Sequence, residues 1–128
     1  MNQPSSKNQQ AVSTILVSRP GIMRQSLQTS LAMYAWITVV AACGDGLTAL
    51  SQVAHHQPRL VIIDSNLLDE EVKALLAAVK AVQPTTRCLV LAQSTHREQA
   101  ILAAGADAVI PRERWVQLAP TLLAQLIR

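Results

Sequence analysis

The chain has 128 residues, of which 50% are apolar, and it carries a formal net charge of +3 at pH 7. This length fits one domain with a full hydrophobic core, and no apolar run approaches the roughly 20 residues that a membrane-spanning helix requires. Basic residues are scattered and only 2% of the residues are aromatic, which argues against direct binding of nucleic acid.

Residues 1–13 are mostly polar and contain no apolar block. We expect them to form a disordered tail, neither a signal peptide nor a strand, on a cytoplasmic protein whose domain covers residues 14–128. Five apolar segments follow, at residues 14–17, 36–42, 60–63, 88–92 and 108–110. Unbroken apolar runs are typical of strands that are covered on both faces. The pattern therefore predicts a buried parallel sheet.

Between these segments, apolar residues recur every three or four positions, the spacing that places side chains on one face of a helix. The first such row is Met23, Leu27, Leu31 and Tyr34, and the third is Leu68, Val72, Leu75, Val79 and Val82. Asp45 and Gly46 are expected to open the second helix and Pro58 to close it. Gly105 is expected to end the fourth helix in a left-handed conformation.

Pro120 complicates the last helix, because proline inside a helix removes a backbone donor and crowds the carbonyl of Val116. Proline suits the first helical position. We therefore expect a short turn through Trp115 and a helix from about Ala119 to Arg128, the alternative being one kinked helix.

Alternating strands and helices with right-handed crossovers predict an α/β fold, a doubly wound sheet with the strand order 2-1-3-4-5. Ligands bind such a sheet at the carboxyl ends of strands one and three. Those ends are Ser18, Arg19 and Asp64, so we expect these side chains to lie together. Cys43 and Cys88 fall in different strands, and we expect buried, reduced thiols.

Three stretches of the chain resemble the receiver domain of two-component response regulators. Residues 14–27 resemble its first strand and helix, especially in the LuxR-type subgroup; residues 57–64 resemble the strand that bears the phosphorylated aspartate, and residues 103–110 the entry to strand five. The resemblance implies the flavodoxin-like fold with five strands and five helices. It also implies that a histidine kinase phosphorylates Asp64, beside a magnesium ion held by Asp64 and an acidic pair that ends strand one.

The acidic pair is missing, because Ser18 and Arg19 occupy its positions. Magnesium binds oxygen ligands and usually one or two carboxylates, so we expect weak or no magnesium binding. We hypothesise that the guanidinium of Arg19 pairs with Asp64 in place of the ion. Asp69, Glu70 and Glu71 are replacement metal ligands or, more simply, acids that suit the start of a helix.

Other family positions also differ. The Ser or Thr that ends strand four corresponds to Ala92, with Ser94 and Thr95 just beyond, and Pro111 and Arg112 stand where the family has an apolar residue followed by lysine. The aromatic switch residue is replaced by Val109. Arg19 and Arg112 are alternatively solvated charges at the rim of the sheet, and Asp64 is alternatively a cap of the next helix.

Trp115 either packs under the last helix or lies exposed beside Arg112 and Arg114, where it would anchor a partner protein. We favour an interface formed by these three residues. The resemblance points to the same surface, because receivers commonly make dimer or output contacts there.

We interpret the chain as an atypical receiver, a pseudo-receiver that is not an enzyme and needs no cofactor. It is expected to act through contacts with a histidine kinase, another signalling protein or a second copy of itself. The alternative is a functional receiver phosphorylated on Asp64, as the N-terminal part of a DNA-binding transcriptional regulator. A flavodoxin-like cofactor binder is disfavoured, since residues 18–21 lack the small polar cluster that cradles a phosphate.

Overall fold

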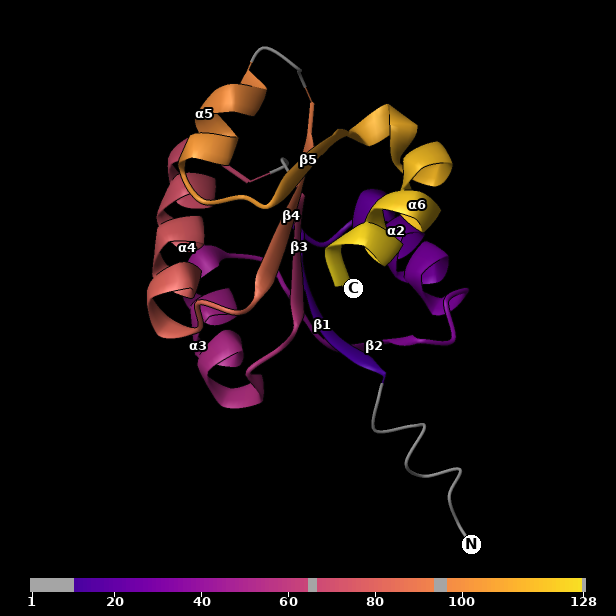
Figure 1. Ribbon diagram of the computed structural model, residues 1–128, viewed down its shortest axis with the longest axis horizontal. Coiled ribbons are helices and arrows are strands. Elements are labelled where there is room, and N and C mark those ends of the chain that lie inside the picture. The colour runs from indigo at the N-terminus through magenta and orange to yellow at the C-terminus, as the bar shows by residue number, and fades with distance from the viewer. Residues whose placement is uncertain (1–10, 65–66, 94–96, 128) are drawn as a thin grey trace, which may run out of the picture.

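The computed structural model describes residues 11–64, 67–93 and 97–127, where a five-stranded parallel sheet lies between two layers of helices (Figure 1). The strands are β1 (Val12–Val17), β2 (Ile37–Cys43), β3 (Leu60–Asp64), β4 (Arg87–Ala92) and β5 (Ala108–Pro111). The helices are α2 (Ile22–Ala32), α3 (Gly46–His56), α4 (Asp69–Val82), α5 (Glu98–Ala103) and α6 (Trp115–Ile127), and the 3-10 turn η2 (Arg112–Arg114) precedes α6. The order β2-β1-β3-β4-β5 confirms the predicted topology.

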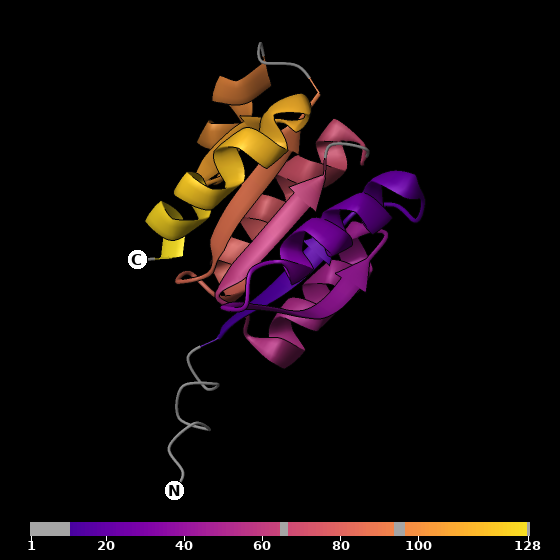
Figure 2. The same ribbon diagram turned by 90° about the vertical axis from the view of Figure 1, so that its right-hand side faces the viewer.

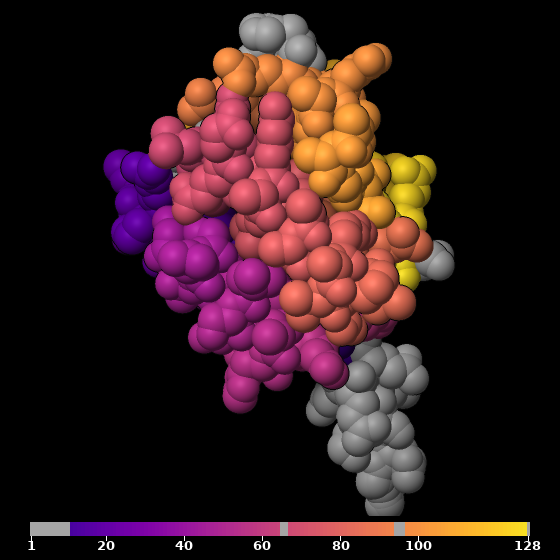
Figure 3. Space-filling view, turned by 90° about the vertical axis from the view of Figure 1, so that its left-hand side faces the viewer, coloured from indigo at the N-terminus to yellow at the C-terminus, as the bar shows by residue number. Residues whose placement is uncertain are grey.

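Helices α3, α4 and α5 cover one face of the sheet and α2 and α6 cover the other (Figures 1 and 2). The first three form a continuous surface (Figure 3). Strand β3 is buried along its whole length, which explains its unbroken apolar run. Val61 and Ile63 pack toward α3, α4 and α5, whereas Leu60 and Ile62 pack toward α2 and α6.

Several predicted helix ends are confirmed. Asp45 caps α3, and its carboxylate accepts a hydrogen bond of 2.8 Å from the backbone N–H of Thr48. Helix α3 ends at His56, where Gln57 adopts a left-handed conformation with φ of 48°. Gly105, with φ of 124°, follows the end of α5.

The predicted start of the last helix is wrong. Helix α6 begins at Trp115 and continues through Pro120, which lies inside it. Trp115 and Ala119 are both buried and hold the first turn against the sheet. The carbonyl that loses its donor belongs to Val116, which is exposed, as is Pro120, so water is available to that carbonyl.

The predicted N-terminal tail is too long. Val12 and Ser13 belong to β1, where Val12 is buried and its N–H donates to the carbonyl of Trp36 at 2.7 Å. A single valine between Ala11 and Ser13 was too weak a signal to indicate a strand. Residues 1–10 lie outside the described residues.

Helix α4 is turned slightly from the predicted orientation. Its buried residues include Leu76, whereas Leu68 and Val82 from the predicted row are exposed. Both thiols are buried and free of disulfides, as predicted for Cys43 and Cys88. None of the helices in the described parts of the chain is long and apolar enough to cross a membrane.

Candidate functional site

Asp64 is the last residue of β3 and is fully buried. Because side chains alternate along a strand, Asp64 points toward the layer of α2 and α6, as Leu60 and Ile62 do. Ser18, just after β1, donates its hydroxyl to Oδ2 of Asp64 at 3.0 Å. Arg112, just after β5, places Nε 3.1 Å from Oδ1. The loop after β1 and the turn after β5 therefore converge on one buried carboxylate.

The contact between Arg112 and Asp64 is electrostatic without a well-aligned hydrogen bond. Nε of Arg112 and Oδ1 of Asp64 are both buried, and at 3.1 Å they form an ion pair, but neither atom has a hydrogen-bond partner of good geometry. The carboxylate is thus oriented by the hydroxyl of Ser18, while the guanidinium supplies compensating charge.

In the structure, Arg112 forms the ion pair with Asp64, whereas the side chain of the predicted partner, Arg19, is exposed. The sheet register explains this arrangement. Val17 of β1 pairs with Ile63 of β3, so the next residues, Ser18 and Asp64, lie side by side. The alternation of side chains then turns Arg19 away from the direction taken by Ser18. Sequence reasoning placed Ser18 and Arg112 correctly beside Asp64, but it assigned the pairing with this carboxylate to Arg19, whereas the structure shows an ion pair with Arg112.

Ala92 ends β4 and is buried beside Pro111 of β5. It contributes a methyl group at the edge of the sheet where Asp64 lies, and therefore no hydroxyl donor. Ser94 and Thr95, the alternative donors, lie outside the described residues. Val109 is partly buried and packs against the core on the side of α3, α4 and α5.

Arg24 supports the site in a way that sequence reasoning missed. Its Nε donates to the backbone carbonyl of Ser18 at 2.9 Å and so fixes the loop after β1. Gly44 allows this packing, because a Cβ there would lie 3.3 Å from Pro20 and 3.4 Å from Arg24. The sequence feature that could have indicated this role is a cation near the start of α2, a position that the helix dipole disfavours.

The acidic residues at the start of α4 are engaged elsewhere. Asp69 forms an ion pair with Arg97, and Glu71 accepts a hydrogen bond of 2.7 Å from the backbone N–H of Gly46. Leu68, and not Asp64, precedes α4 at the capping position. The alternative role of Asp64 as a helix cap is therefore wrong.

The residues around Asp64 do not fit a magnesium ion. Across residues 11–64, 67–93 and 97–127, no three His, Cys, Asp or Glu side chains gather closely enough to hold a metal. The oxygen that would face a cation already faces the guanidinium of Arg112. The side chain that contacts Asp64 from the loop after β1 is the neutral Ser18, whereas magnesium in proteins usually keeps one or two carboxylates.

Trp115 belongs to the core, which corrects the predicted interface. Its side chain is 4% exposed, and its indole N–H donates to the hydroxyl of Ser30 on α2 at 2.9 Å. The neighbouring Arg114 and Val116 are exposed. Arg112 is partly buried, because its side chain turns inward to Asp64.

A parallel sheet of order 2-1-3-4-5 with helices on both faces matches the fold of response regulator receiver domains. The signal receiver domain of the putative response regulator NarL from Mycobacterium tuberculosis has a TM-score of 0.80 and 18% identity, over 91% of this chain and 97% of that chain. A LuxR-family DNA-binding response regulator from Staphylococcus aureus has a TM-score of 0.79 and 15% identity, over 91% of this chain and 99% of that one.

The response regulator RcsB from Salmonella typhimurium has a TM-score of 0.76 and 18% identity, over 91% of this chain and 60% of that one. Neither a protein-family model nor a curated protein matches the chain. The similarity to solved structures shows the receiver fold.

Proposed function

We propose that the chain is a pseudo-receiver, a non-enzymatic cytoplasmic signalling domain that uses the receiver fold to bind other proteins without phosphorylation of Asp64. The observation that carries this proposal is the environment of that carboxylate. Asp64 is fully buried, with Ser18 on one oxygen and Arg112 on the other. A fixed internal ion pair is a structural element that holds one conformation without an added ligand.

Electrostatics also disfavours phosphoryl transfer at this site. A phosphoryl group brings nearly two negative charges at neutral pH, and the guanidinium of Arg112 that pairs with Asp64 carries a single positive charge. Attack on a phosphoryl donor would require Asp64 to leave Arg112 and reach solvent. Without a magnesium ion, the developing charge would remain largely uncompensated.

Magnesium titration followed by backbone amide chemical shifts tests this proposal. We expect no saturable shift at Ser18, Asp64 or Arg112 up to about 10 mM magnesium, because one paired carboxylate is a poor site for this ion. Asp64→Asn provides the matched control, since it removes the charge and keeps the side-chain shape. Saturation below about 1 mM that the variant abolishes would contradict the proposal.

The contact surface that we propose is the η2–α6 surface, defined here as Glu113, Arg114 and Val116. All three side chains are exposed, and Val116 is an apolar side chain that is 78% exposed, shortly after the charged residues Glu113 and Arg114. An apolar centre with an arginine beside it is typical of residues that dominate protein interfaces. The partner is a histidine kinase, another signalling protein or a second copy of this chain.

Sedimentation velocity tests the second-copy partner directly. If the η2–α6 surface mediates self-association, Val116→Asp should weaken it at least tenfold, because a charge would be buried at the contact. Val82→Asp is the matched control, since Val82 is an exposed valine at the end of α4. Equal self-association of both variants would show that the η2–α6 surface does not mediate it. If the wild-type chain is monomeric, the partner of this surface is a different protein.

A phosphoryl-accepting receiver is the second candidate. One observation favours it: a carboxylate is present at the end of β3, with the cation of Arg112 beside it. In this case the chain would be the receiver part of a longer regulator. RcsB, of which this chain spans 60%, is a response regulator studied for DNA interaction.

A further inference from the structure

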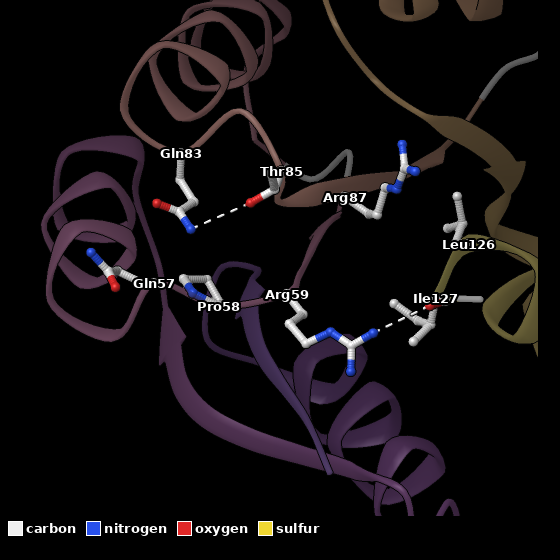
Figure 4. A pocket seen from close by; sticks show the side chains of 8 residues that line it. All are labelled: Gln57, Pro58, Arg59, Gln83, Thr85, Arg87, Leu126 and Ile127. Carbon is white, nitrogen blue, oxygen red and sulfur yellow. Dashed lines mark hydrogen bonds between the residues drawn. The ribbon is translucent and has the colours of Figure 1, made fainter. Parts of the chain in front are cut away.

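A polar pocket of about 260 Å³ opens at the edge of the sheet where β3 and β4 begin (Figure 4). Arg59 precedes β3 and Arg87 begins β4, and both line this pocket. Figure 4 shows Arg59 reaching toward Ile127 at the end of α6, with Gln83 and Thr85 facing one another on the other side. The five residues of β3 separate Arg59 from Asp64 by about 16 Å, so the two sites are distinct.

A larger hollow of about 520 Å³ adjoins this pocket and shares Arg59 and Ile127 with it. Its walls are mainly apolar and include Tyr34 and Trp36, from the turn between α2 and β2, and Pro120 of α6. The two aromatic rings meet edge to face with 5.8 Å between their centroids. Trp36 is 37% exposed, so an aromatic surface remains accessible there.

The polar pocket carries an excess of positive charge. The nearest acid that contacts its arginines is Asp107, whose Oδ1 lies 3.4 Å from Nη1 of Arg87. Asp107 is already paired with Lys80 at 2.7 Å and bonded to the backbone N–H of Cys88 at 2.8 Å. Two cations, Lys80 and Arg87, therefore share one carboxylate. Arg59 contacts no acid in the described residues and donates Nη2 to the carbonyl of Ile127 at 3.2 Å.

We propose that these adjoining hollows form one site for a small organic anion, with a planar apolar body against Trp36 and Tyr34 and an acidic group on Arg59. A guanidinium fork matches a carboxylate, sulfonate or phosphate in two parallel hydrogen bonds. Arg59 uses one donor on a neutral carbonyl, an interaction that an anion replaces with a stronger one. Apolar walls with a few polar groups that fix orientation are the usual form of a ligand site.

The site does not depend on the proposed function, because Asp64, Ser18 and Arg112 lie at the other end of the sheet. It involves the last turn of α6 and the turn before β2, which Trp36 and Tyr34 occupy. A ligand there would hold these two segments together. Arg87 serves as the second cation when the acidic group extends into the polar pocket.

Two probes of similar shape test the proposal on the intact chain. 8-Anilinonaphthalene-1-sulfonate carries the acidic group, and N-phenyl-1-naphthylamine lacks it. We expect one sulfonate probe to bind per chain, measured by calorimetry and by quenching of tryptophan fluorescence. Arg59→Gln should weaken the sulfonate probe about tenfold and the neutral probe less than about twofold, because a charged hydrogen bond is lost only with the anion.

Trp36→Leu should weaken both probes and reduce the quenching, since Trp36 is the tryptophan that lines the hollow, whereas Trp115 is buried in the core. Arg97→Gln is the matched control, an exposed arginine paired with Asp69 near the start of α4. Circular dichroism confirms that each variant is folded. Equal weakening by Arg59→Gln and Arg97→Gln, or binding of several probes per chain that no variant changes, would overturn the proposal.

Discussion

Replacement of Arg112 with methionine should destabilise the protein by leaving a buried carboxylate without its counterion. Two unit charges 3.1 Å apart attract with about 5 kcal/mol at an effective dielectric constant near 20. Loss of one partner of a buried pair typically costs about 3–5 kcal/mol. The Arg112 side chain is 22% exposed and its N–H is not aligned with the acceptor, so we expect about 2 kcal/mol.

Urea unfolding at pH 7 measures this cost, and a double-mutant cycle with Asp64→Asn isolates its origin. The asparagine removes the charge and retains an oxygen that accepts the hydrogen bond from Ser18. In that background Arg112→Met should cost only about 0.5 kcal/mol, the value for a substitution at a partly exposed position. The coupling between the two sites is then about 1.5 kcal/mol.

The same cycle can refute the reasoning. If Arg112→Met costs the same in both backgrounds, its effect comes from packing of the side chain and not from its charge. If the single variant costs less than about 0.3 kcal/mol, the contact contributes nothing to the free energy of unfolding.

Three further predictions concern groups outside this site. Burial raises the pKa of the Cys88 thiol to about 11. The neutral thiol therefore stabilises the fold fully below its pKa in the unfolded chain, near 8.5, and this stabilisation is lost as the pH rises toward 11. A thiol reagent at pH 8 should therefore label Cys88 only when the chain unfolds, and rapid labelling of the native protein would be the contrary result. Burial would raise the pKa of Asp107, but hydrogen bonds from Lys80 and Cys88 lower it more. The carboxylate of Asp107 therefore stabilises the fold above about pH 4, and this stabilisation is lost as the pH falls through the lowered pKa. Asp107→Asn should make the free energy of unfolding, measured with urea, less dependent on pH in this acidic range. An unchanged pH dependence would contradict this. Pro120→Ala should stabilise the chain by about 1 kcal/mol, because it restores a backbone donor inside α6; a lower melting temperature would show that the proline is favourable there.

The sheet was predictable because its signals are local. Each strand is a short apolar run, and the ends of β1 and β3 meet by topology alone, which predicts Ser18 beside Asp64. The buried thiols followed from the same runs. Chain order and burial therefore determine most of the fold and the position of the acid.

The counterion of Asp64 was not predictable in the same way. Arg19 directly follows Ser18 in the sequence, yet its side chain is exposed, because side chains alternate in direction along an extended chain. Arg112 reaches Asp64 because η2 follows β5 directly and turns its side chain inward. The direction of a side chain in a short turn depends on tertiary packing, which no periodic pattern encodes.

Trp115 and Pro120 illustrate the same limit in α6. The composition around Trp115 resembles an interface, but its indole finds a hydroxyl partner in Ser30, 85 positions away in the sequence. Pro120 indicated a helix start, yet buried neighbours on the same helix outweigh its local preference. Long-range contacts decided both cases.

Intact mass after incubation with acetyl phosphate, with and without magnesium, tests the central claim that the receiver fold here works without phosphorylation. Wild type and Asp64→Asn are compared under both conditions, with circular dichroism to confirm folding. We predict no phosphoryl adduct in any sample, because Asp64 is buried and already paired with Arg112. A magnesium-dependent adduct on the wild-type chain that Asp64→Asn abolishes would contradict the account and establish a phosphoryl-accepting receiver.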